Sequence, residues 1–231
     1  MVKYSQPKVI LMNYSLDIDE VCAASAYSTQ QKRPMSEILL EYRDLKETSK
    51  KRMNPERVLE YTIGMGHHSI LEHGLLTYSL EGFSRAMTHQ LVRHRLASYS
   101  QQSQRYVNME DPEFVLPPEI ELDEEAKKIY EDFLEKIPEV YKKLRDKKIK
   151  PEDARMILPN STATNIVFSA NPREVLHIVE LRADYKHAQW EINAAAQSMW
   201  VTAAMVAPNI FNVEIFKKAR LGVPKGEYRL E

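Results

Sequence analysis

Apolar and polar residues alternate with a period of two in parts of this chain, which is the pattern of a half-buried strand. The alternation is regular from Leu76 to Leu80, within residues 75–81 (LLTYSLE). Two further segments, residues 8–14 (KVILMNY) and 161–169 (STATNIVFS), are rich in apolar or β-branched side chains. These three segments are predicted as strands.

Caps and breakers mark the predicted helices. Asn54 is a good N-cap, and Pro55 suits the first position of the helix that follows it. Gly66 ends the same helix. Pro138 should kink or split a long amphipathic helix, because its ring clashes with the preceding turn. The predicted helices are residues 17–27, 35–48, 55–65, 83–94, 123–145, 151–157, 172–182 and 189–206.

The order of these elements predicts the fold class. Strands and helices do not alternate regularly, and the chain has no GxGxxG motif, so a Rossmann fold is not expected. We expect an α/β fold of the α+β type, with a small, mainly antiparallel sheet flanked by helices in a single domain over residues 1–231. The Ala-rich helix at residues 189–206 should be central or lie at a subunit interface, because small side chains allow close approach.

The composition is that of a soluble globular protein. Hydrophobic residues make up 43% of the 231 residues, and 32 Lys and Arg against 33 Asp and Glu give a net charge of −1. This balance argues against coating of nucleic acid or anionic lipid by bulk charge. Cys22 is the only cysteine, so no disulfide framework is expected. The chain shows neither a signal-peptide pattern nor an apolar run of about 20 residues, and we expect a cytoplasmic protein.

Residues 82–109 carry no Asp or Glu. A cluster of arginines without acids is suited to phosphate or carboxylate, since the guanidinium can bind either with two parallel hydrogen bonds. The alternative is a solvated basic loop or arginines paired with distant acids. Neutral polar side chains among the arginines favour the anion site, because they match the edges of a pyrimidine or flavin ring. The segment contains Arg85, Arg93, Arg95 and Arg105, His89 and His94, and Gln90, Ser98, Ser100, Gln101, Gln102, Ser103 and Gln104.

The tripeptide Arg93-His94-Arg95 falls at a predicted helix end. Successive helical residues point about 100° apart, so the two arginines cannot serve one small anion within a helix. If the helix ends there, they can address two ligands. Simple capping of the helix C-terminus by cations is the alternative explanation.

These residues resemble the signature of a known family. Arg93-His94-Arg95, seven residues and then Ser103 is similar to the RHR-x7-S signature of flavin-dependent thymidylate synthases. Further segments resemble the family in the expected order between residues 60 and 192. They are Gly66-His67-His68 with Glu72-His73, Ala154-Arg155 with Leu158-Pro159, and Leu181-Arg182-Ala183-Asp184 with His187 to Ile192.

The resemblance implies a reaction and its participants. NADPH reduces FAD, methylenetetrahydrofolate supplies one carbon, and dUMP becomes dTMP in a homotetramer with shared active sites. Gln101 departs from the family, where an acid is common, and His177 stands where Asn or His occurs. By position, dUMP would bind Gln90, Leu91, Val92, Arg93, Gln101, Gln102, Ser103, Gln104, Arg105, Arg155 and Arg182. FAD would bind Ser69, Arg93, His94, Arg95, Gln101, Asn171, Pro172, Arg173 and His177.

Chemical roles agree with this assignment. Methylation at carbon 5 of uracil needs an electron-rich ring, which Arg182 would stabilise as the catalytic residue, unless it pairs with Asp184 or Glu180. Arg105 and Arg155 with Ser103 could clamp the phosphate. Ser103 is favoured as a binding residue, because no adjacent base that would activate a nucleophile is evident. Cys22 is expected to be buried packing, which disfavours the thymidylate synthases that use a cysteine nucleophile.

Two other classes of protein, a metalloenzyme and a nucleic-acid-binding module, fit the sequence less well. A metal site could use histidines, but His68 to His73 and His89 to His94 are five apart, whereas one helix face needs three or four. A nucleic-acid-binding module could use the Arg-rich residues 85–106, with aromatic side chains stacking on bases. The balanced overall charge argues against such a module.

Overall fold

A computed structural model of the protein describes residues 2–44, 53–184 and 186–212. The chain forms two compact units. The first unit comprises residues 1–8, 79–93 and 99–167, and the second comprises residues 9–78, 94–98 and 168–231. Each unit is therefore built from segments that are far apart in the sequence.

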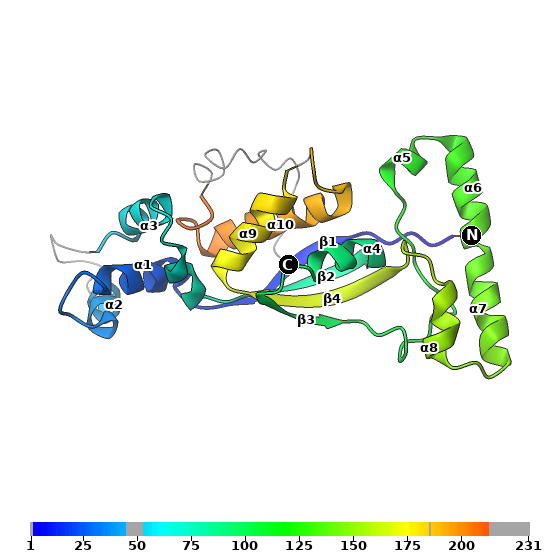
Figure 1. Ribbon diagram of the computed structural model, residues 1–231, viewed down its shortest axis with the longest axis horizontal. Helices are drawn as coiled ribbons and strands as arrows, with labels where there is room; N and C mark the ends of the chain where they lie inside the picture. The colour runs from blue at the N-terminus through cyan, green and yellow to red at the C-terminus, as the bar shows by residue number, and fades with distance from the viewer. Residues whose placement is uncertain (1, 45–52, 185, 213–231) are drawn as a thin grey trace. The chain divides into compact units, whose positions relative to one another are not determined.

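The strands form one antiparallel sheet in the order β1-β2-β4-β3 (Figure 1). β1 is Lys8–Tyr14, β2 is Leu76–Ser84 and β4 is Ala163–Ala170, which confirms the three predicted strands and the small antiparallel sheet. β3, Ala97–Gln101 (ASYSQ), was not predicted. Its side chains are small or polar, so it has no alternation of apolar and polar residues to reveal it.

In the second unit, the N-terminal helices confirm the cap signals. α3 is Pro55–Gly64, and the Asn54 side chain accepts a hydrogen bond from the Arg57 N–H at 3.2 Å. Gly66 follows with φ of 80°, a left-handed conformation that glycine adopts without strain. The same unit contains α1 (Ile18–Ser28), the 3₁₀ helix η1 (His68–His73) and α2 (Met35–Asp44). Residues 45–48 of the predicted second helix lie outside the described residues.

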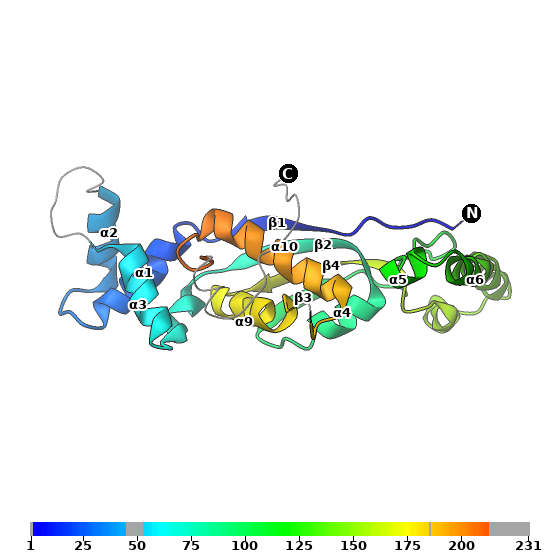
Figure 2. The same cartoon turned by 90° about the horizontal axis from the view of Figure 1, so that it is seen from above.

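Helices α9 (Pro172–Arg182) and α10 (Trp190–Val206) lie side by side in the second unit (Figure 2). Ala195, Ala196 and Met199 of α10 are fully buried, and the Met199 carbonyl accepts a hydrogen bond from the hydroxyl of Tyr78 on β2 at 3.2 Å. The Ala-rich helix is therefore part of the core of its unit. Cys22 is also fully buried, as expected, and burial raises the pKa of its thiol to about 12.

The first unit contains the short helix α4 and a cluster of further helices. The predicted helix at residues 123–145 is divided into α6 (Glu124–Leu134) and α7 (Lys136–Asp146). Pro138 explains the division, since it lacks the N–H that would bond to the carbonyl of Leu134. The remaining elements are α4 (Arg85–Leu91), α5 (Pro118–Glu121), α8 (Pro151–Ala154) and the 3₁₀ helix η2 (Arg155–Ile157).

The predicted helix at residues 83–94 is wrong at both ends. Phe83 belongs to strand β2, and α4 ends at Leu91. The cause is Ser84, whose hydroxyl accepts the Met87 N–H at 3.0 Å and so begins the helix later than the apolar spacing suggested. None of the helices in the described ranges is long and apolar enough to span a bilayer.

Candidate functional site

The Arg93-His94-Arg95 segment follows the end of α4. The Arg93 N–H bonds to the Gln90 carbonyl at 3.3 Å, which closes the last turn. Beyond it, His94 is only 5% exposed, whereas Arg93 and Arg95 on either side of it are exposed. Because α4 ends at Leu91, before Arg93, the condition under which the two arginines can address two ligands is met. The side chains of Arg93 and Arg95 are thus accessible to ligands, whereas that of His94 is buried in the protein.

In the first unit, β3 and the loop after it carry the predicted dUMP residues 101–105. The Gln101 side chain donates to the hydroxyl of Thr88 on α4 at 2.8 Å, and the Gln102 N–H bonds to the carbonyl of Asn165 on β4 at 2.9 Å. These two bonds hold the end of β3 next to α4 and β4. The structure therefore brings residues 101 and 102 close to the helix that carries Gln90, Leu91 and, just beyond its end, Val92.

Ser103 shapes the loop that it belongs to. Its hydroxyl accepts the backbone N–H of Arg105 at 3.2 Å, and its carbonyl accepts the N–H of Tyr106 at 3.2 Å. Within the described residues, no basic side chain is hydrogen-bonded to this hydroxyl. Arg105 extends over the ring of Tyr106, 5.6 Å from its centre, and both side chains are exposed. Ser103 and Arg105 therefore belong to one turn, which also contains Gln104.

Arg85, at the start of α4, was not among the predicted site residues. Its backbone N–H bonds to the Thr162 carbonyl at 3.1 Å, and the next N–H, of Ala86, bonds to the Asn160 carbonyl at 3.0 Å. The Arg85 side chain is partly buried and has no carboxylate partner among the described residues. Burial lowers the pKa of its guanidinium, and the like charge of Arg155 lowers that pKa further.

Two neighbouring arginines without a counterion are costly unless an anion joins them. The predicted substrate residue Arg155 thus has Arg85 as a neighbour, and the first unit carries both. The absence of acids in residues 82–109 was the signal in the sequence that could have singled out Arg85.

In the second unit, Arg182 and His94 are hydrogen-bonded. Arg182 is the last residue of α9, and its Nε donates to Nε2 of His94 at 3.1 Å. The ring of His177, also on α9, meets the His94 ring edge-on with 5.8 Å between centres. The alternative that Arg182 pairs with Asp184 or Glu180 is not observed among the described residues, and Asp184 instead contacts His187 at 2.6 Å.

Most of the other predicted FAD residues lie in the second unit as well, whereas Arg93 and Gln101 belong to the first. Ser69 on η1 lines an open pocket of about 530 Å³ between α1, α3 and η1, together with Tyr27, Arg57, Tyr61 and His67. Pockets of ~300–1,000 Å³ are typical of small-molecule sites. Hydroxyl, guanidinium and aromatic groups line this pocket, and they suit the phosphates and rings of a dinucleotide.

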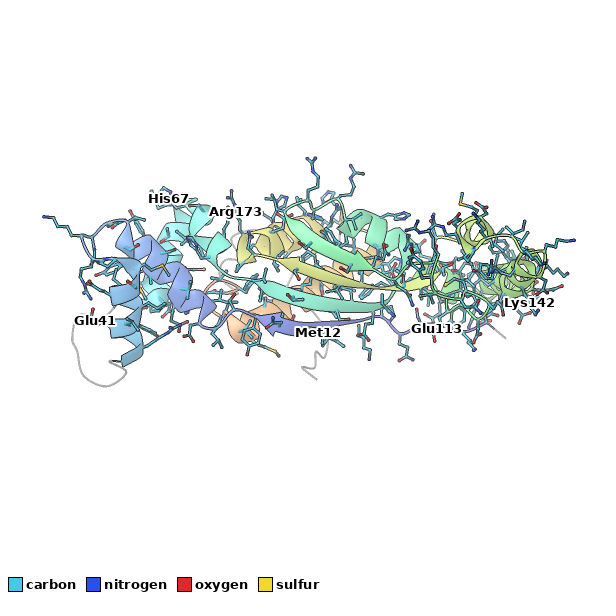
Figure 3. All side chains as sticks on the ribbon, turned by 90° about the horizontal axis from the view of Figure 1, so that it is seen from below. Met12, Glu41, His67, Glu113, Lys142 and Arg173 are labelled. Carbon is cyan, nitrogen blue, oxygen red and sulfur yellow. The ribbon has the colours of Figure 1, made fainter. Side chains whose placement is uncertain are left out.

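The start of α9 carries the remaining predicted FAD residues. The side chain of Asn171 accepts the N–H of Glu174 at 2.9 Å, so it caps the helix, and Pro172 is buried behind it. Arg173, labelled in Figure 3, is exposed, and it forms an ion pair with Glu72 of η1. Exposed ion pairs contribute little to stability, so this guanidinium can exchange Glu72 for a ligand phosphate. In the part of the chain that the structure describes, no three His, Cys, Asp or Glu side chains gather as a metal site would require.

Residues 10–209 match the family described as thymidylate synthase complementing protein. A relative from Clostridium tetani is 34% identical over 220 residues, which cover 88% of this chain and 85% of the relative. One from Geobacter sulfurreducens is 43% identical over 155 residues, 66% of each chain. One from Pyrococcus horikoshii is 50% identical over 147 residues, 62% of this chain and 58% of the relative. All three are described as flavin-dependent thymidylate synthases.

A solved structure has the same fold. It is the UMP/dUMP methylase PolB from Streptomyces cacaoi, bound with 5-Br dUMP. The TM-score is 0.79, with 94% of this chain and 97% of that chain covered, and the sequence identity is 20%. At this identity the likeness concerns the fold alone.

Proposed function

This chain belongs to the family of flavin-dependent thymidylate synthases, and on that premise we propose how its residues convert dUMP to dTMP. The protein is an enzyme that methylates uracil, with FAD as cofactor and with methylenetetrahydrofolate and NADPH as co-substrates. FAD, once reduced by NADPH, supplies the hydride for this methylation. The observation that carries the proposal is the family match over residues 10–209, together with arginines that have no acidic partner among the described residues.

The phosphate of dUMP binds in the first unit. Arg155 and Arg85 repel each other in the free protein, and a phosphate with two negative charges removes that repulsion. Arg105 and the Ser103 hydroxyl add donors from the loop after β3. The remaining contacts to the nucleotide come from Gln90, Leu91, Val92, Arg93, Gln101, Gln102 and Gln104.

Arg182 acts on the uracil ring. Its planar fork would donate to the ring carbonyl and to the deprotonated ring nitrogen, which stabilises the deprotonated, electron-rich ring that reacts at carbon 5. Ser103 acts as a binding residue. Its hydroxyl already accepts a backbone hydrogen bond at 3.2 Å, which orients its own O–H for donation to a phosphate oxygen.

Most of the residues that would hold FAD belong to the second unit, and the donor set there fits the cofactor. The pocket of about 530 Å³ lined by Ser69 accommodates part of FAD. Arg95 and Arg173 would supply cations for its phosphates, and His177, which is exposed, would contact the flavin. The resemblance adds contacts from His94, Asn171 and Pro172 of this unit and from Arg93 and Gln101 of the first unit.

We also propose the assembly and location of the enzyme. It acts as a homotetramer of single-domain chains, with active sites that combine residues of several copies. Its partners are small molecules rather than nucleic acid. It works in the cytoplasm, because its substrate is a charged nucleotide. Mixing Arg93→Ala with Arg182→Ala tests the shared site, since some activity should return after subunit exchange. No recovery after confirmed exchange would mean that one chain supplies both residues.

Formation of dTMP tests the function directly. The purified protein is incubated with dUMP, methylenetetrahydrofolate and NADPH, and dTMP is measured by chromatography. Product should appear, and omitting any one of the three compounds should abolish it. Bleaching of the visible flavin absorbance on addition of NADPH reports the reduction of FAD separately. A protein that binds FAD but forms no dTMP would contradict the proposed activity.

A further inference from the structure

The hydrogen bond between Arg182 and His94 can have only one direction. An arginine side chain is always protonated and has donors but no acceptor, so its Nε–H must donate. Nε2 of His94 must therefore carry no proton. Burial, followed by the charge of Arg182 and the neighbouring His177, lowers the pKa of the His94 imidazole to about 4. At neutral pH the imidazole is thus an uncharged acceptor.

The environment of Arg182 leaves its two terminal nitrogens available. Its backbone carbonyl accepts a hydrogen bond from the side chain of Asn193 on α10 at 3.0 Å, which fixes the end of α9. Its Nε–H is taken by His94. Among the described residues, Nη1 and Nη2 have no hydrogen bond or ion pair. Because a guanidinium is planar, a fixed Nε–H also fixes the direction of both terminal N–H pairs.

We propose that His94 is a positioning residue for Arg182: its unprotonated Nε2 holds the Nε–H of Arg182 and so aims the terminal fork at the uracil of dUMP. The inference rests on the proposed function, in which Arg182 polarises that ring. It gives the histidine of the Arg93-His94-Arg95 segment a role that acts through Arg182, in addition to the contact with FAD that the resemblance implies. A protonated His94 could not hold Arg182 in this way, because its Nε2–H would face the Nε–H of Arg182 and neither group can accept a hydrogen bond.

Two variants show whether activity requires the hydrogen-bond acceptor of His94 or only a side chain that fills the same space. His94→Phe keeps a buried ring but removes the acceptor. His94→Gln restores an acceptor oxygen near the place of Nε2. In the FAD-loaded enzyme, His94→Phe should lower kcat on the order of 10- to 100-fold with a smaller change in the KM for dUMP, because a misaimed group costs chiefly in the transition state. His94→Gln should recover most of that loss. His187→Phe, at an exposed histidine, is the matched control and should keep wild-type kcat.

A double-variant comparison shows whether His94 acts through Arg182. Arg182→Lys removes the Nε–H, so His94→Phe added to Arg182→Lys should cause little further loss of kcat. Multiplication of the two separate losses would overturn the proposal, because independent roles combine in that way. Loss of FAD from His94→Phe in proportion to activity would also overturn it, because the loss of turnover would then come from the cofactor contact alone.

The wild-type enzyme provides a test that needs no folded variant. With histidines labelled with ¹⁵N, the holoenzyme should show His94 with Nδ1 protonated and Nε2 unprotonated at neutral pH. A doubly protonated His94 would overturn the proposal. The outcome is separate from the proposed function, because a wild-type holoenzyme that forms no dTMP would refute that function whatever the state of His94.

Discussion

The carboxylate of Asp19, in the first turn of α1, accepts the backbone N–H of Asn209 at 2.7 Å and that of Ile210 at 3.3 Å. The two partners come directly after α10, so this side chain ties the start of the second unit's first helix to the end of its last one. Asp19 is 3% exposed. Burial raises the pKa of its carboxyl to about 6, although the two backbone hydrogen bonds act in the opposite direction.

This raised pKa predicts a pH-dependent stability. The folded protein binds the proton of Asp19 more tightly than the unfolded chain, whose aspartates titrate near pH ~4. The stabilising effect is therefore complete below pH ~4 and is lost as the pH rises through about 6. Asp19→Asn removes this titration. The free energy of unfolding of the variant, relative to that of the wild type, should therefore increase as the pH rises from ~4 to about 6. The expected gain is about 3 kcal/mol at most, measured by urea unfolding at several pH values. Asp146→Asn, at an exposed aspartate, should show no such trend, and a constant difference for Asp19→Asn would refute the prediction.

Arg182→Lys should lower turnover more than dUMP affinity. Lysine keeps the positive charge but loses the planar fork and the Nε–H that His94 accepts. The expected loss in kcat is on the order of 10²-fold, about 2.7 kcal/mol, which is typical of one preorganised electrostatic contact. Steady-state dTMP formation and equilibrium dUMP binding measure the two effects. Arg145→Lys on α7 is the control, and an equal loss in affinity and turnover would make Arg182 a simple binding residue.

Ser103→Ala should weaken dUMP binding but leave measurable turnover at saturating dUMP. A hydroxyl that binds phosphate contributes about 1.5–3 kcal/mol, which corresponds to a loss of affinity of about 10- to 100-fold. The assay is dTMP formation with reduced flavin supplied. Ser100→Ala, on the adjacent strand, serves as the matched control for affinity. Undetectable product from Ser103→Ala, with FAD and dUMP both bound, would make Ser103 the catalytic nucleophile.

Arg85→Met should weaken binding of dUMP by about 10- to 100-fold and leave binding of deoxyuridine unchanged, because the nucleoside has no phosphate. The melting temperature of the ligand-free variant should not fall, since an arginine that repels Arg155 is replaced by an apolar side chain of similar length. Calorimetric titration with both ligands measures the effect, with Arg145→Met as the control. Equal weakening of both ligands would show that Arg85 supports the fold rather than the phosphate.

Arg95→Ala should reduce retention of FAD. Arg95 is exposed and has no ion pair among the described residues, so its charge is available to the cofactor. The loss of one charge-assisted hydrogen bond should raise the dissociation constant for FAD by about 10- to 100-fold. The measurement is flavin absorbance per chain after gel filtration. Arg43→Ala, at an arginine that pairs with Asp17 in the same unit, should retain wild-type flavin content, and full occupancy in Arg95→Ala would remove Arg95 from the site.

The elements with a strong local signal were predicted well. Asn54 and Gly66 mark the limits of α3, and Pro138 divides α6 from α7, because caps and proline act within a few residues of the chain. β3 was missed because a polar edge strand is stabilised by hydrogen bonds to its neighbour, such as that between Gln102 and Asn165, and not by its own apolar pattern. The late start of α4 was missed although its signal is local, because the cap Ser84, and not the apolar spacing, sets where the helix begins.

The sequence by itself determined the family and the positions of most of the proposed site residues, since the spacing of Arg93-His94-Arg95 and Ser103 depends only on the order of residues in the chain. Tertiary structure decided the partners of those residues. Arg182 bonds to His94 across 88 positions, although acidic Asp184 and Glu180 are closer in the sequence. The physical reason is that hydrogen bonds and ionic repulsion act over a few ångströms in space. Only folding determines which side chains come within that range.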